Sequence, residues 1–126
     1  MRPLEGIKVL DMSRVLAGPF AGRILHDLGA EVVKIEPPEG DVTRHWGKVR
    51  AGLAGYYTQQ NIGKRNVCID LRAEGGTEII RRLATEADVL IENFRPGVMK
   101  KYGLSYEDLK PLNEKLIMLS ISGFGQ

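Results

Sequence analysis

The sequence predicts an α/β fold: a Rossmann-like, mainly parallel sheet with flanking helices. Three observations support this class. Short apolar runs of strand length alternate with longer segments that have the periodicity of a helix. Glycine and proline separate most of these runs, and no internal repeat interrupts the alternation. The chain has 126 residues, which suits one domain at most.

The first part of the chain predicts two strands joined by a helix. Residues 7–11 and 31–36 are short runs rich in β-branched residues, and turn-forming residues lie beside them, so we expect strands there. Residues 19–28 predict the helix, because Pro19 suits a first helical turn and Gly29 suits a C-terminal stop. The helix should face inward with four apolar residues at helical spacing, namely Phe20, Ile24, Leu25 and Leu28.

The rest of the chain predicts a long loop followed by further strands and helices. Residues 37–60 have no steady period, so we expect a loop with a short helix near 53–60. Residues 74–86 predict a helix, and shorter helical pieces are expected at 98–102 and 106–109. The inward residues expected on the longer helix are Ile79, Ile80, Leu83 and Ala87. Three more strands are expected, at residues 67–71, 88–92 and 116–120.

This order of elements also predicts where a ligand would bind. Strands that alternate with helices form parallel sheets through right-handed crossovers, which makes the expected sheet doubly wound. Ligands of such sheets bind outside the carboxyl ends of the strands. The candidate site is therefore formed by the residues that follow the five strands, after Asp11, Glu36, Leu71, Glu92 and Ser120.

Composition excludes several other classes. The chain has 18 Lys plus Arg against 16 Asp plus Glu, and this net charge of +2 is too small and too scattered to suggest nucleic acid. No apolar run approaches the ~20 residues that a membrane span needs, so we expect no membrane association. Cys68 is the single cysteine, which fits a cytoplasmic protein; we expect it to be a buried, inert thiol. The two histidines have no neighbours at metal-ligand spacing, and no Ser-His-Asp set can be assigned.

The segment after the first strand suggests an anion site. Residues 12–19 form a turn that leads into a helix, where backbone N–H groups could face an anion and Arg14 could add a side chain. The alternative is a tight strand-to-helix joint without a ligand. The dinucleotide fingerprint G-x-G-x-x-G is absent, because Gly18 and Gly22 are spaced G-x-x-x-G. Without those glycines, Glu36 is better interpreted as a loop anchor than as a ribose-binding acid.

Two later segments also place polar groups at strand ends. Asp70, Leu71 and Arg72 follow one expected strand, and residues 92–103 combine an amide, an aromatic ring, a guanidinium and two ammonium groups. An aromatic face can hold a base while Arg and Lys neutralise phosphates, and Arg95 and Lys101 have the spacing to flank a diphosphate. The alternative is a surface helix with solvated charges. The basic residues within 61–65 are interpreted as a solvated loop.

With these motifs in view, the chain resembles the class III CoA-transferases, the group that includes formyl-CoA transferase, carnitine CoA-transferase and alpha-methylacyl-CoA racemase. Two motifs are the most telling, Arg14-Val15-Leu16-Ala17-Gly18-Pro19 and Glu92-Asn93-Phe94-Arg95-Pro96-Gly97. All matching stretches occur in order, at residues 4–11, 14–19, 27–36, 40–44, 61–65, 69–71, 87–97 and 120–126.

The resemblance implies that coenzyme A, as free CoA or acyl-CoA, lies across the carboxyl ends of the strands. From the residues themselves, we expect no metal. The positions that the resemblance assigns to CoA binding are Arg14, Val15, Leu16, Ala17, Ile69, Asp70, Leu71, Arg72, Asn93, Phe94, Arg95, Val98 and Lys101. Of these, Arg95 and Lys101 correspond to positions that direct basic groups toward the phosphates in relatives.

The family reaction moves CoA from an acyl-CoA to a carboxylic acid acceptor through an aspartyl-CoA thioester. By resemblance, the catalytic aspartate lies beyond Gln126, so no catalytic residue is assigned within the chain. The chain is thus expected to be the N-terminal CoA-binding portion of a larger domain, truncated after its fifth strand and inactive alone. The full-length protein is expected to be an intertwined homodimer. Two alternatives stay open: an acyl-CoA racemase or epimerase, and a non-catalytic nucleotide-binding module.

Overall fold

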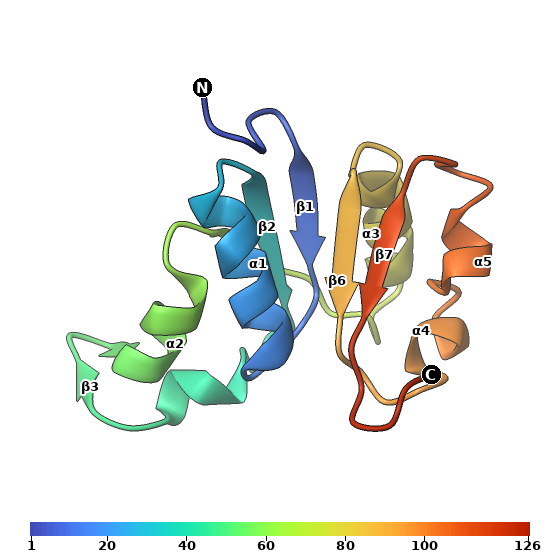
Figure 1. Cartoon of the computed structure of the whole chain (residues 1–126). Helices are drawn as coiled ribbons and strands as arrows, with labels where there is room; N and C mark the ends of the chain where they lie inside the picture. Colours follow the sequence, from blue (N-terminus) through green and yellow to red (C-terminus); the bar gives the residue numbers. More distant parts are fainter.

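The computed structural model describes residues 1–126 and shows a five-stranded parallel sheet with helices on both faces (Figure 1). The strands of this sheet are β1 (Lys8–Asp11), β2 (Glu31–Glu36), β5 (Arg65–Cys68), β6 (Val89–Glu92) and β7 (Ile117–Ser120). Their order is β5-β2-β1-β6-β7, and each neighbouring pair is parallel. The predicted Rossmann-like α/β class is therefore confirmed.

The strand order reverses at the centre of the sheet. Chain order runs outward from β1 through β2 to β5 on one side, and from β6 to β7 on the other. Leu10 of β1 pairs with Val33 on one side and with Leu90 on the other. The carboxyl ends of β1 and β6 therefore form the switch point at which ligands of doubly wound sheets usually bind.

The helices divide between the two faces. On one face lie α1 (Ala17–Asp27) and α2 (Gly55–Asn61), in front of the sheet in Figure 1. On the other lie α3 (Gly76–Ala84), α4 (Val98–Lys101) and α5 (Tyr106–Leu109). We refer to these as the α1 face and the α3 face.

The segment between β2 and α2 was predicted as a loop, and it contains short regular elements. These are a 3-10 helix, η1 (Val42–His45), and a hairpin of β3 (Val49–Arg50) and β4 (Leu53–Ala54). The expected short helix near 53–60 is found as α2. The third expected strand ends at Cys68 rather than at Leu71, because the chain turns away after the Ile69 amide bonds the Glu36 carbonyl.

The α3 face contains the larger apolar core. One cluster comprises Leu10, Met12, Ile35, Ile69, Ile80, Ala84, Ala87, Leu90, Met99, Leu104, Leu109 and Leu116. Ile80 and Ala87 face inward as predicted. Ile79 and Leu83 do not: they are 48% and 38% exposed. Helix α3 is shorter than expected, and its contact with the sheet is a narrow row of buried residues that includes Ile80 and Ala84.

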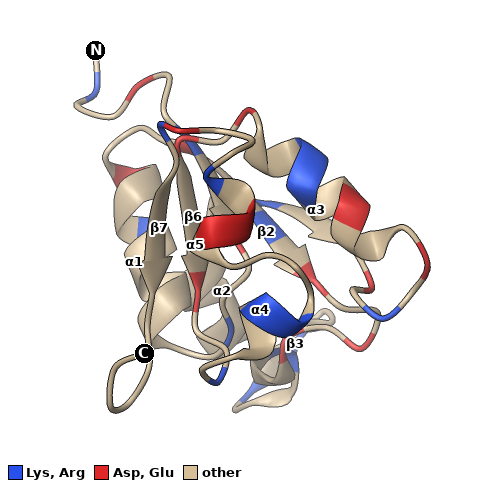
Figure 2. Cartoon of the chain, turned by 90° about the vertical axis from the view of Figure 1, so that its right-hand side faces the viewer, with Lys and Arg blue, Asp and Glu red and all other residues tan.

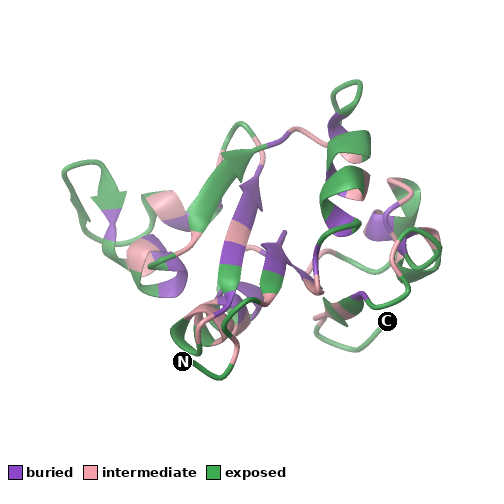
Figure 3. Ribbon diagram, turned by 90° about the horizontal axis from the view of Figure 1, so that it is seen from above, coloured by how far each residue is buried: buried purple, intermediate pink, exposed green.

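The α1 face has a smaller apolar core, formed by Val9, Ala30, Val32 and Ile91. The predicted inward face of α1 is wrong, since Phe20, Ile24 and Leu28 are 48%, 42% and 41% exposed, and only Leu25 packs on this core. The buried residues of α1 are the small Gly18, Pro19 and Gly22. Figure 3 shows the buried central strands and the exposed outer surfaces of the helices.

A close approach of α1 to the sheet explains this inversion. A Cβ added to Gly18 would lie 2.1 Å from the Ser13 Cβ, and one added to Gly22 would lie 2.7 Å from Asp11 Oδ2. Bulky side chains therefore cannot occupy the inner face of α1, and the apolar residues of the helix point outward.

Cys68 is exposed rather than buried, because β5 is an edge strand with a partner on one side only. None of the helices combines the length and apolar character that a membrane span requires.

Candidate functional site

Polar side chains are buried on the α1 face near the carboxyl ends of the strands. Strand alternation directs Val9 and Asp11 of β1 to this face, together with Lys34 and Glu36 of β2. Two buried ion pairs result: Lys64 Nζ lies 2.7 Å from Asp11 Oδ2, and Lys34 Nζ lies 3.2 Å from Asp41 Oδ2. We call the residues Asp11, Lys34, Asp41 and Lys64 the buried charge cluster.

Lys64 joins the end of β1 to the first turn of α1. Its ammonium donates to Asp11, to the Pro19 carbonyl at 2.7 Å and to Asn61 Oδ1 at 2.9 Å. Burial lowers the pKa of Lys64, although the Asp11 carboxylate opposes this effect. The expectation of a solvated loop at residues 61–65 is therefore wrong for Asn61 and Lys64, which are part of the interior.

Glu36 anchors the loop that follows β2, as the sequence predicted. Its carboxylate accepts hydrogen bonds from Arg44 at 2.7 and 2.9 Å and from the Asp41 amide at 2.8 Å, and also from the two side chains Tyr57 and Asn66. Burial alone would raise the pKa of Glu36, but these bonds outweigh burial and lower it to about 2.

At the switch point, the Asn93 side chain joins the ends of β1 and β6. Asn93 Oδ1 accepts the Arg14 amide at 2.8 Å, and Asn93 Nδ2 donates to the Arg14 carbonyl at 2.7 Å. Both ends of the Asn93 amide are thus engaged with the turn after β1. The backbone of Arg14 is held in place and its side chain is directed to the α3 face.

A cavity of about 200 Å³ opens beside this turn, at the carboxyl ends of β1, β2, β5 and β6. It is lined by Met12, Arg14, Ile35, Glu36, Pro37, Glu39, Ile69, Asp70, Leu71, Arg72, Phe94, Val98 and Tyr102. Because whole ligand sites usually have ~300–1,000 Å³, this cavity suits one part of a larger ligand. We call it the carboxyl-edge cavity.

The walls of the carboxyl-edge cavity combine an apolar shelf with one unsatisfied donor. Ile35, Ile69 and Phe94 offer apolar surface suited to a planar ring. The Arg14 guanidinium lies 5.4 Å from the centre of the Phe94 ring, and its Nε is buried without a hydrogen-bond partner. An unpaired buried donor is costly, so an acceptor on a ligand would complete this site.

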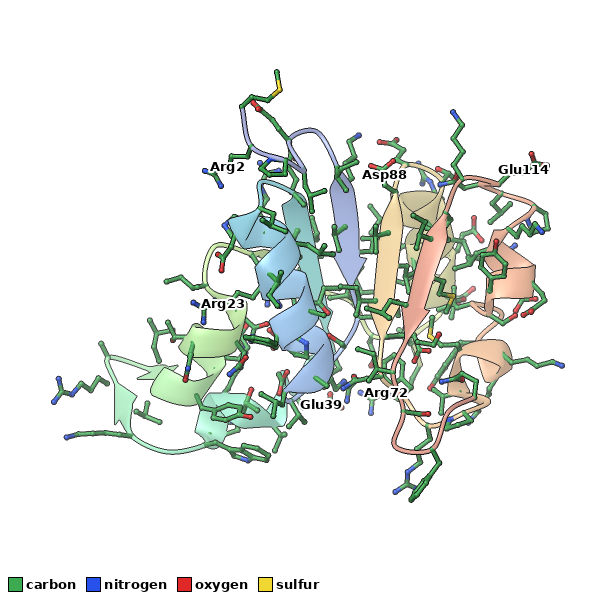
Figure 4. All side chains as sticks on the ribbon, viewed as in Figure 1. Arg2, Arg23, Glu39, Arg72, Asp88 and Glu114 are labelled. Carbon is green, nitrogen blue, oxygen red and sulfur yellow. The ribbon has the colours of Figure 1, made fainter.

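Charged groups lie at the mouth of the cavity. Arg72 pairs with Asp70 at 2.8 Å and with Glu39 at 3.0 Å, all with exposed or half-exposed side chains. Figure 4 shows Glu39 and Arg72 together at the carboxyl edge, whereas Arg2 and Asp88 lie at the opposite edge. The hydrogen bond to Asp70 raises the pKa of Arg72, so Arg72 is a permanent cation at this mouth.

Seven of the positions predicted from the resemblance line the cavity: Arg14, Ile69, Asp70, Leu71, Arg72, Phe94 and Val98. Asn93 and Arg95 line an adjoining cavity of about 370 Å³, with the turn at residues 122–125. Val15, Leu16, Ala17 and Lys101 line neither cavity. Lys101 is exposed on α4, where basic residues gather beside the acidic ones of α5 (Figure 2).

Six lining residues were not assigned from the sequence, namely Met12, Ile35, Glu36, Pro37, Glu39 and Tyr102. Four of them could have been predicted from their position, because they lie at or just after the ends of β1 and β2. Ile35 and Tyr102 do not lie at such positions.

A larger cavity of about 430 Å³ lies at the amino ends of β2 and β5, lined by residues such as Arg2, His26 and Arg65.

The chain is similar to known proteins over almost its whole length. The profile of the family described as CoA-transferase family III matches residues 4–126. A succinate–glutarate CoA-transferase of Agrobacterium fabrum is 51% identical over 132 residues, covering 98% of this chain and 33% of that protein. The human succinyl-CoA:glutarate CoA-transferase is 45% identical over 128 residues, covering 100% of this chain and 29% of that protein.

Solved structures give the same result. A CAIB/BAIF family protein from Brucella suis superposes with a TM-score of 0.91 at 51% identity, covering 97% of this chain and 34% of that one. The Rv3272 protein of Mycobacterium tuberculosis superposes with a TM-score of 0.92 at 44% identity, covering 98% and 35%.

The fold and the cavity define a doubly wound α/β protein with an opening at its switch point that suits one part of a larger ligand. The chain belongs to CoA-transferase family III, which confirms the resemblance predicted from the motifs. It spans about a third of the length of the curated relatives that it matches.

Proposed function

We propose that residues 1–126 are the N-terminal CoA-binding portion of a class III CoA-transferase that moves coenzyme A between an acyl-CoA and a carboxylic acid. One observation carries this proposal: the carboxyl-edge cavity of a family III chain is lined by seven positions that the family resemblance assigns to CoA. The names of the relatives are those of CoA-transferases, which favours this activity over a racemase or epimerase.

In this proposal, the apolar shelf of Ile35, Ile69 and Phe94 holds the base. The unpaired Arg14 Nε donates to an acceptor on the nucleotide. Arg72 lies at the mouth and exchanges its carboxylate partners for a phosphate, since Arg–phosphate pairs are strong and bidentate. Arg95 and Lys101, which have no carboxylate partners, neutralise the remaining phosphate charge.

The proposed chemistry proceeds through two anhydrides. An aspartate carboxylate attacks the acyl-CoA thioester, which forms a mixed anhydride and releases CoA thiolate. The thiolate attacks the aspartyl carbonyl, giving an enzyme thioester and the free donor acid. The acceptor carboxylate repeats these two steps in reverse order, which yields the new acyl-CoA and restores the aspartate.

The aspartates of this chain already have structural partners, which supports placing the catalytic aspartate outside residues 1–126. Asp11 and Asp41 are buried in ion pairs, Asp70 pairs with Arg72, and Asp108 caps α5. Asp27 pairs with Arg23, and Asp88 accepts the Lys8 amide. The chain alone is therefore expected to bind CoA without turnover, and turnover by the purified chain would contradict this part of the proposal.

Isothermal titration of the chain with CoA and with NAD tests the binding function. We expect heat of binding with CoA, and a response to NAD alone would overturn the proposal. Phe94→Ala should weaken CoA binding about tenfold, because base–aromatic stacking contributes ~1–3 kcal/mol. Tyr106→Ala, which removes an aromatic ring from the surface of α5, is the matched control and should bind like the parent chain.

The phosphate contacts are tested by Arg95→Ala. This change should weaken CoA severalfold, with a loss that shrinks as salt concentration rises, because the lost contact is electrostatic. Arg82→Ala on α3 removes an exposed charge far from the cavity and should leave the affinity unchanged. Equal affinities of all three chains would mean that Arg95 is a solvated surface charge.

A further inference from the structure

Three consecutive amides follow β1, and each is already bonded to a side-chain oxygen. Ser13 N donates to Asp11 Oδ1 at 3.0 Å, Arg14 N to Asn93 Oδ1 at 2.8 Å, and Val15 N to Asp41 Oδ2 at 3.1 Å. In many doubly wound proteins, amides at this turn face the ligand. Here the chain's own side chains occupy them, so the expected anion site is absent at these three residues.

Val15 has a backbone conformation that requires support. Its φ is 72°, in the left-handed region that a β-branched residue avoids. Such a conformation persists only where surrounding contacts impose it. The Val15 amide donates to Asp41 Oδ2 at 3.1 Å, so Asp41 contacts this residue directly and can help to hold its conformation.

The Asp41 carboxylate accepts three further hydrogen bonds. Its Oδ2 also accepts from Lys34 Nζ at 3.2 Å, and its Oδ1 accepts from the Thr43 amide at 3.0 Å and from Thr43 Oγ1 at 2.8 Å. Both Asp41 and Lys34 are fully buried. Lys34 in turn donates to the Ser13 carbonyl at 2.8 Å, so it contacts the same turn from β2.

Val15 separates the two functional parts of the turn. Arg14 precedes it and extends into the carboxyl-edge cavity, while Leu16 follows it and begins the entry to α1. If Val15 left the left-handed region, the chain would change direction between these parts. Asn93 holds the Arg14 backbone from β6, and Val15 sets the direction in which the chain continues from Arg14 into α1, so the place of the Arg14 side chain depends on both contacts.

We infer that Asp41, supported by Lys34, is a positioning residue: it holds Val15 in its left-handed conformation and so places Arg14 in the ligand cavity. The consequence for CoA affinity rests on the proposed function, whereas the effect on the Val15 backbone does not.

The first test is a double variant, Lys34→Met/Asp41→Ala. It removes the acceptor of the Val15 amide without leaving one buried charge unpaired. We expect CoA affinity to fall about tenfold, the scale set by the strain of one left-handed residue. Adding Val15→Gly should restore most of the affinity, because glycine adopts this φ without support. A loss of affinity that Val15→Gly does not restore would overturn the inference.

The matched control is Thr43→Val. It loosens the other oxygen of Asp41 and the start of η1, but it leaves the Val15 contact in place. We expect lower stability with unchanged CoA affinity. If Thr43→Val weakened CoA as much as the double variant does, Asp41 would act by anchoring the loop, and the inference would be wrong.

Amide hydrogen exchange separates this inference from the proposed function. In the parent chain, the Val15 and Ser13 amides should both exchange slowly, because each is hydrogen-bonded to a buried carboxylate. In the double variant, Val15 should lose its protection while Ser13, bonded to Asp11, keeps it. A fast Val15 amide in the parent chain would contradict the inference even if the double variant failed to fold. Absence of CoA binding by a chain with a protected Val15 would contradict only the proposed function.

Discussion

The two faces of the sheet are built on different principles near the carboxyl ends of the strands. On the α3 face, apolar side chains continue to the ends of β1, β2 and β5 and line the carboxyl-edge cavity through Met12, Ile35 and Ile69. On the α1 face, the apolar residues Val9 of β1 and Val32 of β2 are followed toward the carboxyl ends by the buried charged residues Asp11 and Lys34.

This difference explains why the helices differ as well. Helix α3 packs Ile80 and Ala84 on an apolar surface. Helix α1 packs closely on the end of β1, with Gly18 against Ser13 and Gly22 against Asp11 and Lys64. Phe20 and Ile24 therefore lie on its outer side. A buried ion pair contributes little net stability compared with apolar packing, but it fixes a defined geometry. We infer that the α1 face orients the strand-end turns while the α3 face supplies most of the stability.

The largest expected effect comes from breaking a buried pair on the α1 face. Lys64→Met leaves the Asp11 charge buried without its partner, and we expect a loss of about 3–5 kcal/mol in the free energy of unfolding. Its neighbour Arg65 provides the control, because it pairs with Glu31 at 3.9 Å on the surface. Arg65→Met should cost less than about 1 kcal/mol in urea unfolding. Equal losses would mean that the cluster is solvated.

The two helices should respond differently to truncation. Ile80→Ala on α3 removes a fully buried side chain and should cost about 2–5 kcal/mol in the free energy of unfolding. Ile24→Ala on α1 should cost well under 1 kcal/mol, because that side chain is 42% exposed. Thermal unfolding of both variants measures the two losses of stability. A larger loss from Ile24→Ala would reverse the comparison between the two helices.

Acid should destabilise the α1 face through Glu36. The pKa of Glu36 falls from 4.5 to about 2 on folding, so its stabilising contribution is complete above pH 4.5 and is lost as the pH falls toward 2. The contribution amounts to roughly 3 kcal/mol. Urea unfolding followed from pH 6 to pH 2 should show this loss, and Glu36→Gln should flatten it. An unchanged slope in Glu36→Gln would show that other carboxylates are responsible.

The close approach of α1 predicts a smaller effect. Gly18→Ala places a Cβ 2.1 Å from the Ser13 Cβ, so the helix must move, at a cost of about 1–3 kcal/mol. Gly55, at the start of α2, has its nearest neighbour 4.0 Å away from an added Cβ. Gly55→Ala should be neutral or slightly stabilising in the same thermal assay. A harmless Gly18→Ala would mean that α1 packs loosely.

Much of the fold could be predicted because apolar periodicity and turn residues determine it locally. Strand β2 lies at the predicted residues, and Glu36 anchors the following loop as expected. The inner face of α1 could not be predicted in this way, since Gly18 packs on Ser13 while Gly22 packs on Asp11 and Lys64, and Lys64 comes from a distant part of the chain. The interior position of Lys64 depends on the same tertiary contacts, which no local pattern records.

The lining of the cavity was predictable where residues follow a strand within a few positions, as Arg14, Arg72 and Phe94 do. The contacts that each side chain makes were harder to predict. Asn93 is predicted to contact the ligand, and the structure adds that both ends of its amide bind the Arg14 backbone. Pairing across the switch point depends on strand order, which only the folded sheet determines.

Nitrogen-15 chemical-shift mapping with CoA tests the central claim, that the ligand occupies the carboxyl edge between the two differently built faces. We predict that the largest changes occur at Arg14, residues 69–72, Phe94 and Val98, which line the carboxyl-edge cavity. Changes concentrated at Arg2, His26 and Arg65, around the larger cavity at the amino edge, would contradict it.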